Sequence, residues 1–424
     1  MDVLTRVDRG ELADRAYSRA AEGLVPRDRH WLQELVYGTL RLRGRLDYLL
    51  AAFVRGGTTA LDPVVLNVLR LGVYQLLEMG SVPSYAAVSQ SVELARAAGA
   101  ARAAGLVNGV LQALRRGVAE VRFPSFEVDP IEHLTTWGSH PRWLVERWLN
   151  RWGPDETLRL VEANNGRPEL FLRPIGISPA GAVERLVEQG IPAESVPEFP
   201  DSVRVMPPGS PTEALGAVRA VVQDPAAAMV VRYAEFPEGA LVLDVSAAPG
   251  GKAIALADRA GLVVAADITS GRLQRLQANV ARLGLHERVV PVVADGRTPP
   301  FRPAGAVLLD TPCTGTGTLR RHPDGRWRLG PADLEALVAL QRELLAAAAG
   351  LVSPGGLLVY ATCSLEPEEN EAQVEWFLDR HPGFRLAAPE GSFDGTMIQG
   401  GLLNVRPQLH GVDGAFSARM MRSA

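Results

Sequence analysis

The chain has 424 residues, of which 47% are hydrophobic and 22% charged, a composition typical of globular proteins. This length leaves room for two or three domains, and a formal net charge of −4 argues against a protein that is strongly basic throughout. Arginine nevertheless outnumbers Asp and Glu within residues 1–120, which indicates either an anionic partner there or a solvated helical surface.

The two cysteines, Cys313 and Cys363, are too few for a disulfide framework, and no cluster has zinc-ligand spacing. No secretory signal opens the sequence and no apolar run is long enough to span a membrane. We therefore expect a cytoplasmic protein that works in a reducing compartment. We also expect a monomer with no metal and no membrane association.

Residues 1–118 are predicted to form one helix after another, because apolar residues such as Leu32, Leu35 and Val36 recur at helical spacing. Arginines at 41, 43 and 45 are candidates for phosphate contacts, with exposed helix positions as the alternative. The stretches Ala86–Ala95 and Leu106–Leu111 resemble the NusB-like helical RNA-binding domain. That resemblance covers about the first quarter of the chain and implies an all-helical domain over 1–120.

Residues 130–220 are predicted to form a small α/β subdomain. Its helical beginning carries tryptophans whose spacing fits packing of an amphipathic helix better than stacking on bases: Trp143, Trp148 and Trp152. Short strands over Leu170–Arg173 and Val203–Val205 follow, with a helix over Gly181–Gln189 between them.

From residue 221 onward, buried strands alternate with helices, which is the pattern of a doubly wound, mostly parallel sheet. The predicted strands are Ala240–Val245, Leu262–Ala266, Val289–Val293, Val307–Leu309 and Leu357–Ala361. Helices are predicted over Arg272–Leu283 and Ala332–Ala348. The last segment, Asp413–Arg419, is predicted to close the sheet as an antiparallel edge strand.

The first of these strands leads into Ser246-Ala247-Ala248-Pro249-Gly250-Gly251-Lys252, a glycine loop that opens a helix. It is neither a dinucleotide loop nor a P-loop. Asp267 ends the next strand, where it could accept both hydroxyls of a ribose, and Asp295 ends the third, where it could accept an adenine amino group. Carboxylates without a phosphate cradle suit a nucleoside with a cationic group, such as S-adenosylmethionine. We expect the loop residues with Asp267, Arg272, Asp295 and Asp310 to bind it.

Cys313 and Cys363 each follow a predicted strand, at the edge where such sheets bind ligands. A free cysteine is usually a small buried hydrophobe, but two that occur only at strand ends favour a chemical role. Lys252 is the only lysine of the chain, and it lies in the glycine loop. Its presence where arginine is used everywhere else favours a role that needs a compact ammonium.

Three motifs closely resemble the NOL/NOP/Sun family of RNA cytosine-carbon-5 methyltransferases: Ser246–Lys252, Asp310–Gly317 and Tyr360–Ser364. Val222–Ala226 and Arg320–Asp324 also match. The departures are Ser246 in place of cysteine, Thr311 in place of alanine and Thr314 in place of serine. The resemblance covers almost the whole chain and implies a class I Rossmann-like methyltransferase domain over 221–424. Together with the NusB-like front end, it implies methylation of a 16S ribosomal RNA cytosine.

A thiolate must add to carbon-6 of cytosine before carbon-5 can attack a methyl sulfonium. The residues alone leave the two thiols exchangeable in this reaction. The resemblance makes Cys363 the nucleophile and Cys313 the residue that assists product release. Asp310 can hydrogen-bond the cytosine ring nitrogen, and Lys252 can orient Asp310 or lower the pKa of a thiol.

The target base must be flipped out or lie in a loop. A basic cluster is a candidate for holding the RNA backbone and stacking a base, with ordinary surface positions as the alternative for part of it: Arg320, Arg321, His322, Arg326, Trp327 and Arg328. The alternative substrates are a transfer RNA or another ribosomal cytosine. A third possibility is an RNA-binding assembly factor that has lost catalysis, against which the presence of Cys313, Cys363, Asp310 and Lys252 argues.

Overall fold

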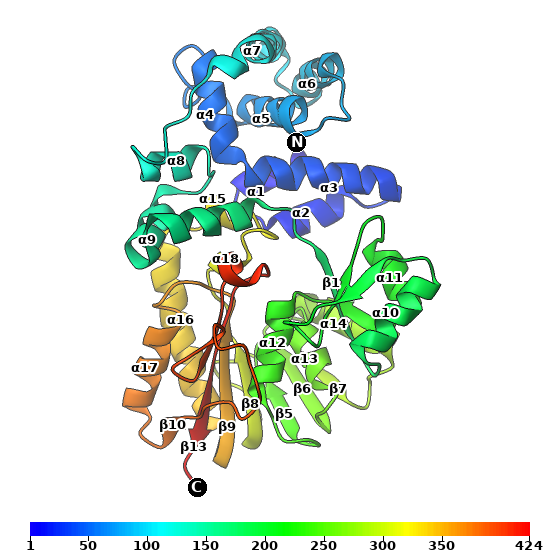
Figure 1. Cartoon of the computed structure of the whole chain (residues 1–424), viewed down its shortest axis with the longest axis vertical. Helices are drawn as coiled ribbons and strands as arrows, with labels where there is room; N and C mark the ends of the chain where they lie inside the picture. The colour runs from blue at the N-terminus through cyan, green and yellow to red at the C-terminus, as the bar shows by residue number, and fades with distance from the viewer. The chain divides into compact units, whose positions relative to one another are not determined.

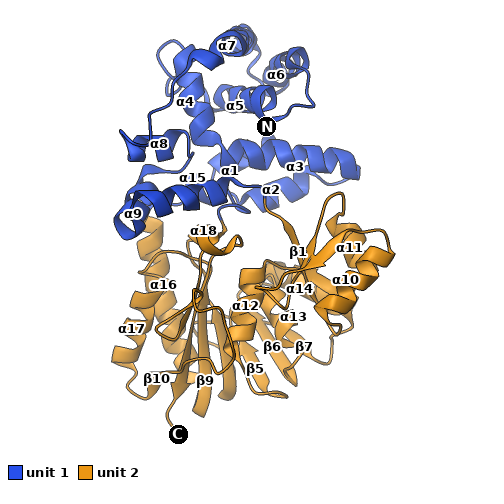
Figure 2. Cartoon of the chain, in the orientation of Figure 1, with its two compact units in different colours: residues 1–167, 319–330 blue, residues 168–318, 331–424 orange.

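The computed structural model describes residues 1–424, which divide into two compact units (Figure 2). Unit 1 comprises residues 1–167 and 319–330, and unit 2 comprises residues 168–318 and 331–424. The three domains expected from the sequence, 1–120, 130–220 and 221–424, stay a prediction. None of the helices has the length and apolar character needed to cross a membrane.

Unit 1 is helical, as predicted, and its helices are labelled in Figure 1. They are α1 (Asp2–Asp8), α2 (Ala13–Ala20), α3 (Pro26–Arg41), α4 (Arg43–Phe53), α5 (Pro63–Glu78), α6 (Ser84–Ala97), α7 (Ala104–Gly117), α8 (Pro130–Thr136), α9 (Arg142–Asn165) and α15 (Gly325–Arg328). The α9 helix bends at Gly153, whose φ of 77° is left-handed, and Pro154 follows it. Trp148 of α9 is buried, which confirms the packing role predicted for it.

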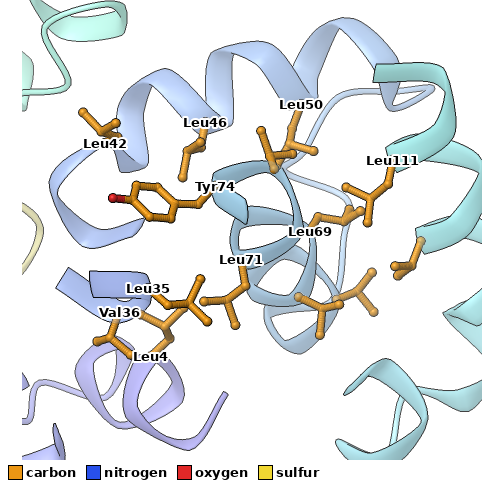
Figure 3. Packing of buried hydrophobic residues seen from close by; sticks show 14 of the residues in the cluster. Leu4, Leu35, Val36, Leu42, Leu46, Leu50, Leu69, Leu71, Tyr74 and Leu111 are labelled. Carbon is orange, nitrogen blue, oxygen red and sulfur yellow. The ribbon is translucent and has the colours of Figure 1, made fainter. Parts of the chain in front are cut away.

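The core of unit 1 forms around α5 (Figure 3). Pro63 occupies the first turn of this helix. The Asp62 side chain caps the helix by accepting the Val64 N–H at 2.8 Å. Leu69 and Leu71 are fully buried, and the labelled side chains of α3, α4 and α7 surround them. Most of the free energy that holds these helices together therefore comes from apolar burial, at roughly 25 cal/mol per Å².

The segment 319–330 belongs to unit 1, although the chain on both sides of it belongs to unit 2. Arg326 is its anchor, with a fully buried side chain. The guanidinium donates to the backbone oxygens of Arg41, Ser139 and Asn164 and to Oδ1 of Asn165, at 2.7 to 3.1 Å. Trp327 Nε1 donates to Leu40 O at 2.6 Å.

These contacts contradict one of the predicted RNA contacts. Arg326 cannot hold RNA, because its side chain is fully buried and its guanidinium is hydrogen-bonded inside the protein. Trp327 is partly exposed, so its predicted stacking on a base stays a prediction. The basic residues do not recur at helical or strand spacing, so the sequence did not indicate that the Arg326 side chain is buried. For the other members of the cluster, residues 320–322 and 328, RNA contact stays a prediction.

Unit 2 begins with a small antiparallel sheet in the order β2-β3-β1-β4. Its strands are β1 (Leu170–Pro174), β2 (Ala193–Ser195), β3 (Val203–Val205) and β4 (Ala220–Val222), with helices α10 (Pro179–Glu188) and α11 (Pro211–Ala217). Leu172 and Leu186 are buried in the core between this sheet and α10. The α/β character predicted for this segment is confirmed.

The large sheet of unit 2 has the order β11-β12-β13-β9-β8-β5-β6-β7, and β10 pairs with β13. The strands are β5 (Leu241–Asp244), β6 (Leu262–Asp267), β7 (Val289–Val293), β8 (Ala304–Asp310), β9 (Val352–Thr362), β10 (Phe384–Leu386), β11 (Ile398–Gln399), β12 (Leu402–Val405) and β13 (Ala415–Arg422). The helices are α12 (Pro225–Ala234), α13 (Gly251–Leu256), α14 (Ser270–Leu283), α16 (Pro331–Gly350), α17 (Glu371–Arg380) and α18 (Pro407–His410). Strands β5 to β9 pair in parallel, as predicted.

Helices cover both faces of this sheet, so successive strand residues are buried on opposite sides. In β8, Leu308 packs in the cluster that contains α14, while Leu309 packs in the cluster that contains α16 and α17. A parallel sheet buried on both faces explains why its strands are continuous apolar runs in the sequence. It also leaves only the strand ends accessible to ligands.

The predicted edge position of the last strand is wrong. Strand β13 lies between β9 and β12, so β12 and β11 extend the sheet beyond it. Both are short, and β11 lies within the glycine-rich stretch 391–401 that β12 directly follows, which gives little strand signal. The antiparallel pairing predicted for β13 is confirmed, since Ser417 pairs with Ala361 of β9.

Replacing Arg326 should destabilise unit 1 strongly. In Arg326→Ala several buried oxygens lose their donor, which costs about 3 kcal/mol or more. Calorimetry of the full chain should show that the unfolding transition that includes unit 1 has a clearly lower melting temperature in Arg326→Ala than in the wild type. The control Arg19→Ala breaks an exposed ion pair with Glu11 in the same unit and should cost under about 1 kcal/mol. Equal melting temperatures for the two variants would contradict this account.

Candidate active site

The two cysteines converge at the carboxyl ends of neighbouring strands. Strands β8 and β9 run in parallel with Asp310 opposite Ala361, and the Thr311 N–H donates to Ala361 O at 3.0 Å. Cys363 directly follows β9, and Cys313 lies in the loop after β8. Their sulfurs are 3.4 Å apart, both thiols are free and both residues are partly exposed. The parallel register therefore brings together two side chains that are 50 positions apart.

Three chain segments meet behind the thiols. The Gly317 N–H donates to Cys363 O at 2.9 Å, and the Gly414 N–H donates to Gly317 O at 2.7 Å. A Cβ on Gly317 would lie 2.7 Å from both Cys363 O and Gly414 Cα, so a larger residue would force the segments apart. Glycine at this position therefore fixes the separation of the two cysteine loops.

Lys252 and Asp310 form an ion pair beside the thiols. Lys252 Nζ lies 2.7 Å from Asp310 Oδ2, and the two side chains are 16% and 27% exposed. Burial lowers the pKa of Lys252, but Asp310 and then Cys363 and Asp244 stabilise the ammonium, and the pKa is raised overall. The only lysine of the chain is thus an ammonium that faces both a carboxylate and a thiol.

Asp244, at the end of β5, is a buried carboxyl for which no role was predicted. It is 1% exposed, and its Oδ2 has no hydrogen-bond partner. Burial and the negative charge of Asp310 raise its pKa to about 8, against the opposing effect of Lys252. Its position at the end of a central strand was visible in the sequence. Its complete burial was not.

The glycine loop lies at the same edge of the sheet. Gly250 has a φ of 106°, and a Cβ there would lie 2.6 Å from the Leu276 side chain. The Ala247 N–H donates to Ala266 O at 2.8 Å, and the Ala248 N–H donates to Asp267 Oδ2 at 3.1 Å. These contacts hold residues 246–252 between the ends of β5 and β6.

Two of the carboxylates predicted to bind a cofactor are paired with arginines. Asp267 is 3% exposed, and its Oδ1 lies 3.0 Å from Arg272 Nε. Asp295 forms a bidentate pair with Arg297, the shortest distance being 2.7 Å. The two arginine side chains are 43% and 48% exposed, so they have solvent to move into. These carboxylate acceptors fit the hydroxyl and amino donors of a nucleoside, which would take the place of the arginines.

Sequence reasoning also missed Glu369 and Gln341, which lie beneath the Cys313 loop with no exposed surface. Glu369 sits in the acidic run Glu368–Glu371, which is typical of a solvated surface. Its proximity to Cys363 in the sequence was the only available signal.

Three protein-family models match successive parts of the chain. The model of the NusB family matches residues 1–116, and a ferredoxin-like domain of RsmF/B-like methyltransferases matches residues 140–211. The model described as 16S rRNA methyltransferase RsmB/F matches residues 233–421.

Whole-chain relatives point the same way. Ribosomal RNA small subunit methyltransferase B of Klebsiella pneumoniae is 35% identical over 98% of this chain and 95% of its own length. The protein of the same name from Serratia proteamaculans is 33% identical over 98% and 96%. The crystal structure of PH0851 covers 99% of this chain and 96% of its own, with a TM-score of 0.79 and 28% identity.

The raised pKa of Asp244 predicts a pH dependence of stability. The folded state keeps this carboxyl protonated up to a pH of about 8. The unfolded state loses the proton near pH 4, so wild-type stability should fall as the pH rises from about 4 to about 8, with a slope of about 1.4 kcal/mol per pH unit at most. Asp244→Asn cannot ionise and should lack this component. Chemical denaturation of both proteins across that range tests it, and parallel stability curves would contradict it.

Proposed function

The chain belongs to the RsmB/F family of 16S rRNA methyltransferases and is an RNA methyltransferase. From this premise we propose that it transfers a methyl group from S-adenosylmethionine to carbon-5 of a cytosine in 16S ribosomal RNA, through a covalent bond to Cys363. The observation that carries the proposal is the pair of thiols 3.4 Å apart beside the Lys252–Asp310 ion pair. Methylation of a more nucleophilic atom would need no thiol at all.

S-adenosylmethionine supplies an electrophilic methyl sulfonium when it is bound. We assign its binding to the loop 246–252, with Asp267 accepting the ribose hydroxyls and Asp295 the adenine amino group. Arg272, whose Nε lies 3.0 Å from Asp267 Oδ1, would release this carboxylate to the ribose and contact the ligand itself. Asp310 is paired with Lys252, whose ammonium also interacts with Cys363.

Cys363 attacks first. Its thiolate forms a bond to carbon-6, and the electron pair of the carbon-5–carbon-6 double bond shifts so that the ring becomes an enamine. The Asp310 carboxyl group, in its protonated form, binds the ring nitrogen N3 and donates that proton to it, and the Lys252 ammonium stabilises the carboxylate that is left. This transfer offsets the negative charge that would otherwise build up on the ring.

Carbon-5 of the enamine then takes the methyl group, and the ring must be released. The proton on carbon-5 passes to water, its electron pair restores the double bond to carbon-6, and N3 returns its proton. The bond between carbon-6 and sulfur breaks, and the electron pair leaves with Cys363. The Cys313 S–H lies within hydrogen-bond reach of this sulfur and stabilises the departing thiolate.

The substrate assignment has rivals within the same chemistry, namely a transfer RNA or another ribosomal cytosine. Bisulfite sequencing of RNA from a strain that lacks the gene separates these possibilities. We expect one protected cytosine in 16S ribosomal RNA to disappear and to return with the intact gene. Loss of protection only in transfer RNA would overturn the substrate, and unchanged protection everywhere would favour an assembly factor without catalysis.

The roles of the cysteines predict different outcomes for two substitutions. Cys363→Ala should lose activity by about 10³-fold or more and form no covalent complex, because no thiolate reaches carbon-6. Cys313→Ala should still attack but release slowly, so a denaturation-resistant complex with unmodified RNA accumulates. Denaturing gels with labelled RNA measure both. A complex formed by Cys363→Ala would contradict the assignment.

Cofactor binding should depend on Asp267. Asp267→Ala removes an acceptor for two hydroxyls, so the Kd for S-adenosylmethionine should rise by roughly 10- to 100-fold. Isothermal titration calorimetry measures this without RNA. The control Glu287→Ala removes an exposed carboxylate of the same unit and should leave the Kd unchanged. Equal affinities for Asp267→Ala and wild type would rule out the ribose contact.

A further inference from the structure

A buried carboxylate lies under the Cys313 loop and takes no part in the reaction proposed above. Glu369 has no exposed surface. Its Oε1 accepts the Thr314 N–H and Gln341 Nε2, both at 2.9 Å, and its Oε2 accepts the Thr314 hydroxyl at 2.5 Å. All three groups donate, so the arrangement suits an ionised acceptor. All three are neutral, so none of them cancels the charge.

These contacts hold the backbone on both sides of Cys313. Glu369 binds the N–H of the residue that follows it, and Gln341 Nε2 also donates to O of the preceding Pro312, at 2.9 Å. Gln341 is itself oriented by Gln373, whose Nε2 donates to Gln341 Oε1 at 3.0 Å. The position of the Cys313 loop is therefore set by Gln341 of α16 and by Glu369, which lies two residues before α17.

The charges around the two sulfurs differ in sign. The Glu369 carboxylate adds a negative charge on the Cys313 side, while the Lys252 ammonium interacts with Cys363. The pKa of the Cys313 thiol is raised well above its usual range by its hydrogen bond to Cys363, by burial, and by the charges of Cys363 and Glu369. A thiol in this setting stays protonated when its neighbour ionises.

We propose that Glu369 is a positioning residue that keeps Cys313 as a neutral thiol and thereby makes the two sulfurs unequal. The inference rests on the proposed function, since it explains how that site assigns attack to one sulfur and hydrogen-bond donation to the other. Without this carboxylate, two adjacent cysteines at similar strand ends would compete for the same proton. With it, a negative charge on Cys313 is disfavoured, and this sulfur remains a hydrogen-bond donor.

The other titratable groups near Cys313 do not remove this asymmetry. Tyr360 donates its hydroxyl to Glu369 O at 2.6 Å, and burial raises the pKa of Tyr360 well above its usual range, so it stays neutral. Asp310 is paired with Lys252 at 2.7 Å. Burial also raises the pKa of Glu369, while hydrogen bonds from Ser364 and Thr314 oppose that rise and favour its charged form.

The test measures the ionisation of Cys313 directly, in chains whose other thiol is replaced. The rate of alkylation by iodoacetamide is followed against pH in Cys363→Ser and in the same chain with Glu369→Gln. The Glu369→Gln substitution removes the carboxylate, and the pH at which Cys313 is alkylated at half its maximal rate should fall by about one unit. The reason is that a negative charge near the thiolate is lost. An unchanged midpoint in a folded Glu369→Gln chain would overturn the proposal.

Two further variants separate charge from structure. Glu369→Asp keeps the charge and should restore the higher midpoint, whereas Thr314→Val keeps the charge but loses a hydrogen bond and should move the midpoint by less than about 0.3 pH units. A change in Thr314→Val equal to that in Glu369→Gln would assign Glu369 a purely structural role and overturn the proposal.

The unaltered protein gives a result even if the substitutions prevent folding. Brief labelling near neutral pH, followed by peptide mass analysis, should find Cys363 alkylated before Cys313. Labelling of Cys313 first would contradict the proposal. Neither measurement uses RNA or S-adenosylmethionine, so failure of the proposed methylation would not alter these results.

Discussion

The structure of unit 2 depends on the parallel pairing of β8 and β9, which sets two loops side by side at the carboxyl edge of the sheet. Parallel register places Asp310 opposite Ala361, and the cysteines a few residues further on then have sulfurs 3.4 Å apart. Gly317 allows this approach, because a side chain there would meet backbone atoms at 2.7 Å. This geometry supports the proposed mechanism, in which adjacent sulfurs divide attack and release between them.

Proximity alone does not distinguish the two thiols. In the proposed mechanism the difference comes from two charged groups, the buried Glu369 carboxylate beside the Cys313 loop and the Lys252 ammonium paired with Asp310. In a poorly solvated site such charges act strongly, because water does not screen them. On this proposal, residues in α13 and just before α17 contribute to function as well as to the packing of the sheet.

Much of this arrangement could be predicted from the sequence, because strand ends and motifs are local features. The strand Val289–Val293 agrees residue for residue with β7, and the positions of Cys313, Cys363 and Lys252 indicated one site. Long-range burial could not be predicted. Arg326 looks like its basic neighbours in the sequence but is fully buried, and Glu369 lies within an acidic run that suggests solvent. Both depend on which residues distant in the sequence pack against them.

The proposed mechanism requires Cys363 to bond covalently to cytosine during methyl transfer. The decisive experiment is to incubate the native protein and S-adenosylmethionine with 16S ribosomal RNA that contains 5-fluorocytosine. Fluorine replaces the proton that must leave carbon-5, so the covalent complex is trapped after methylation. The account predicts one adduct, and digestion followed by mass spectrometry should locate the methylated nucleotide on the peptide that contains Cys363. A nucleotide attached to Cys313, or active enzyme without any adduct, would contradict the account.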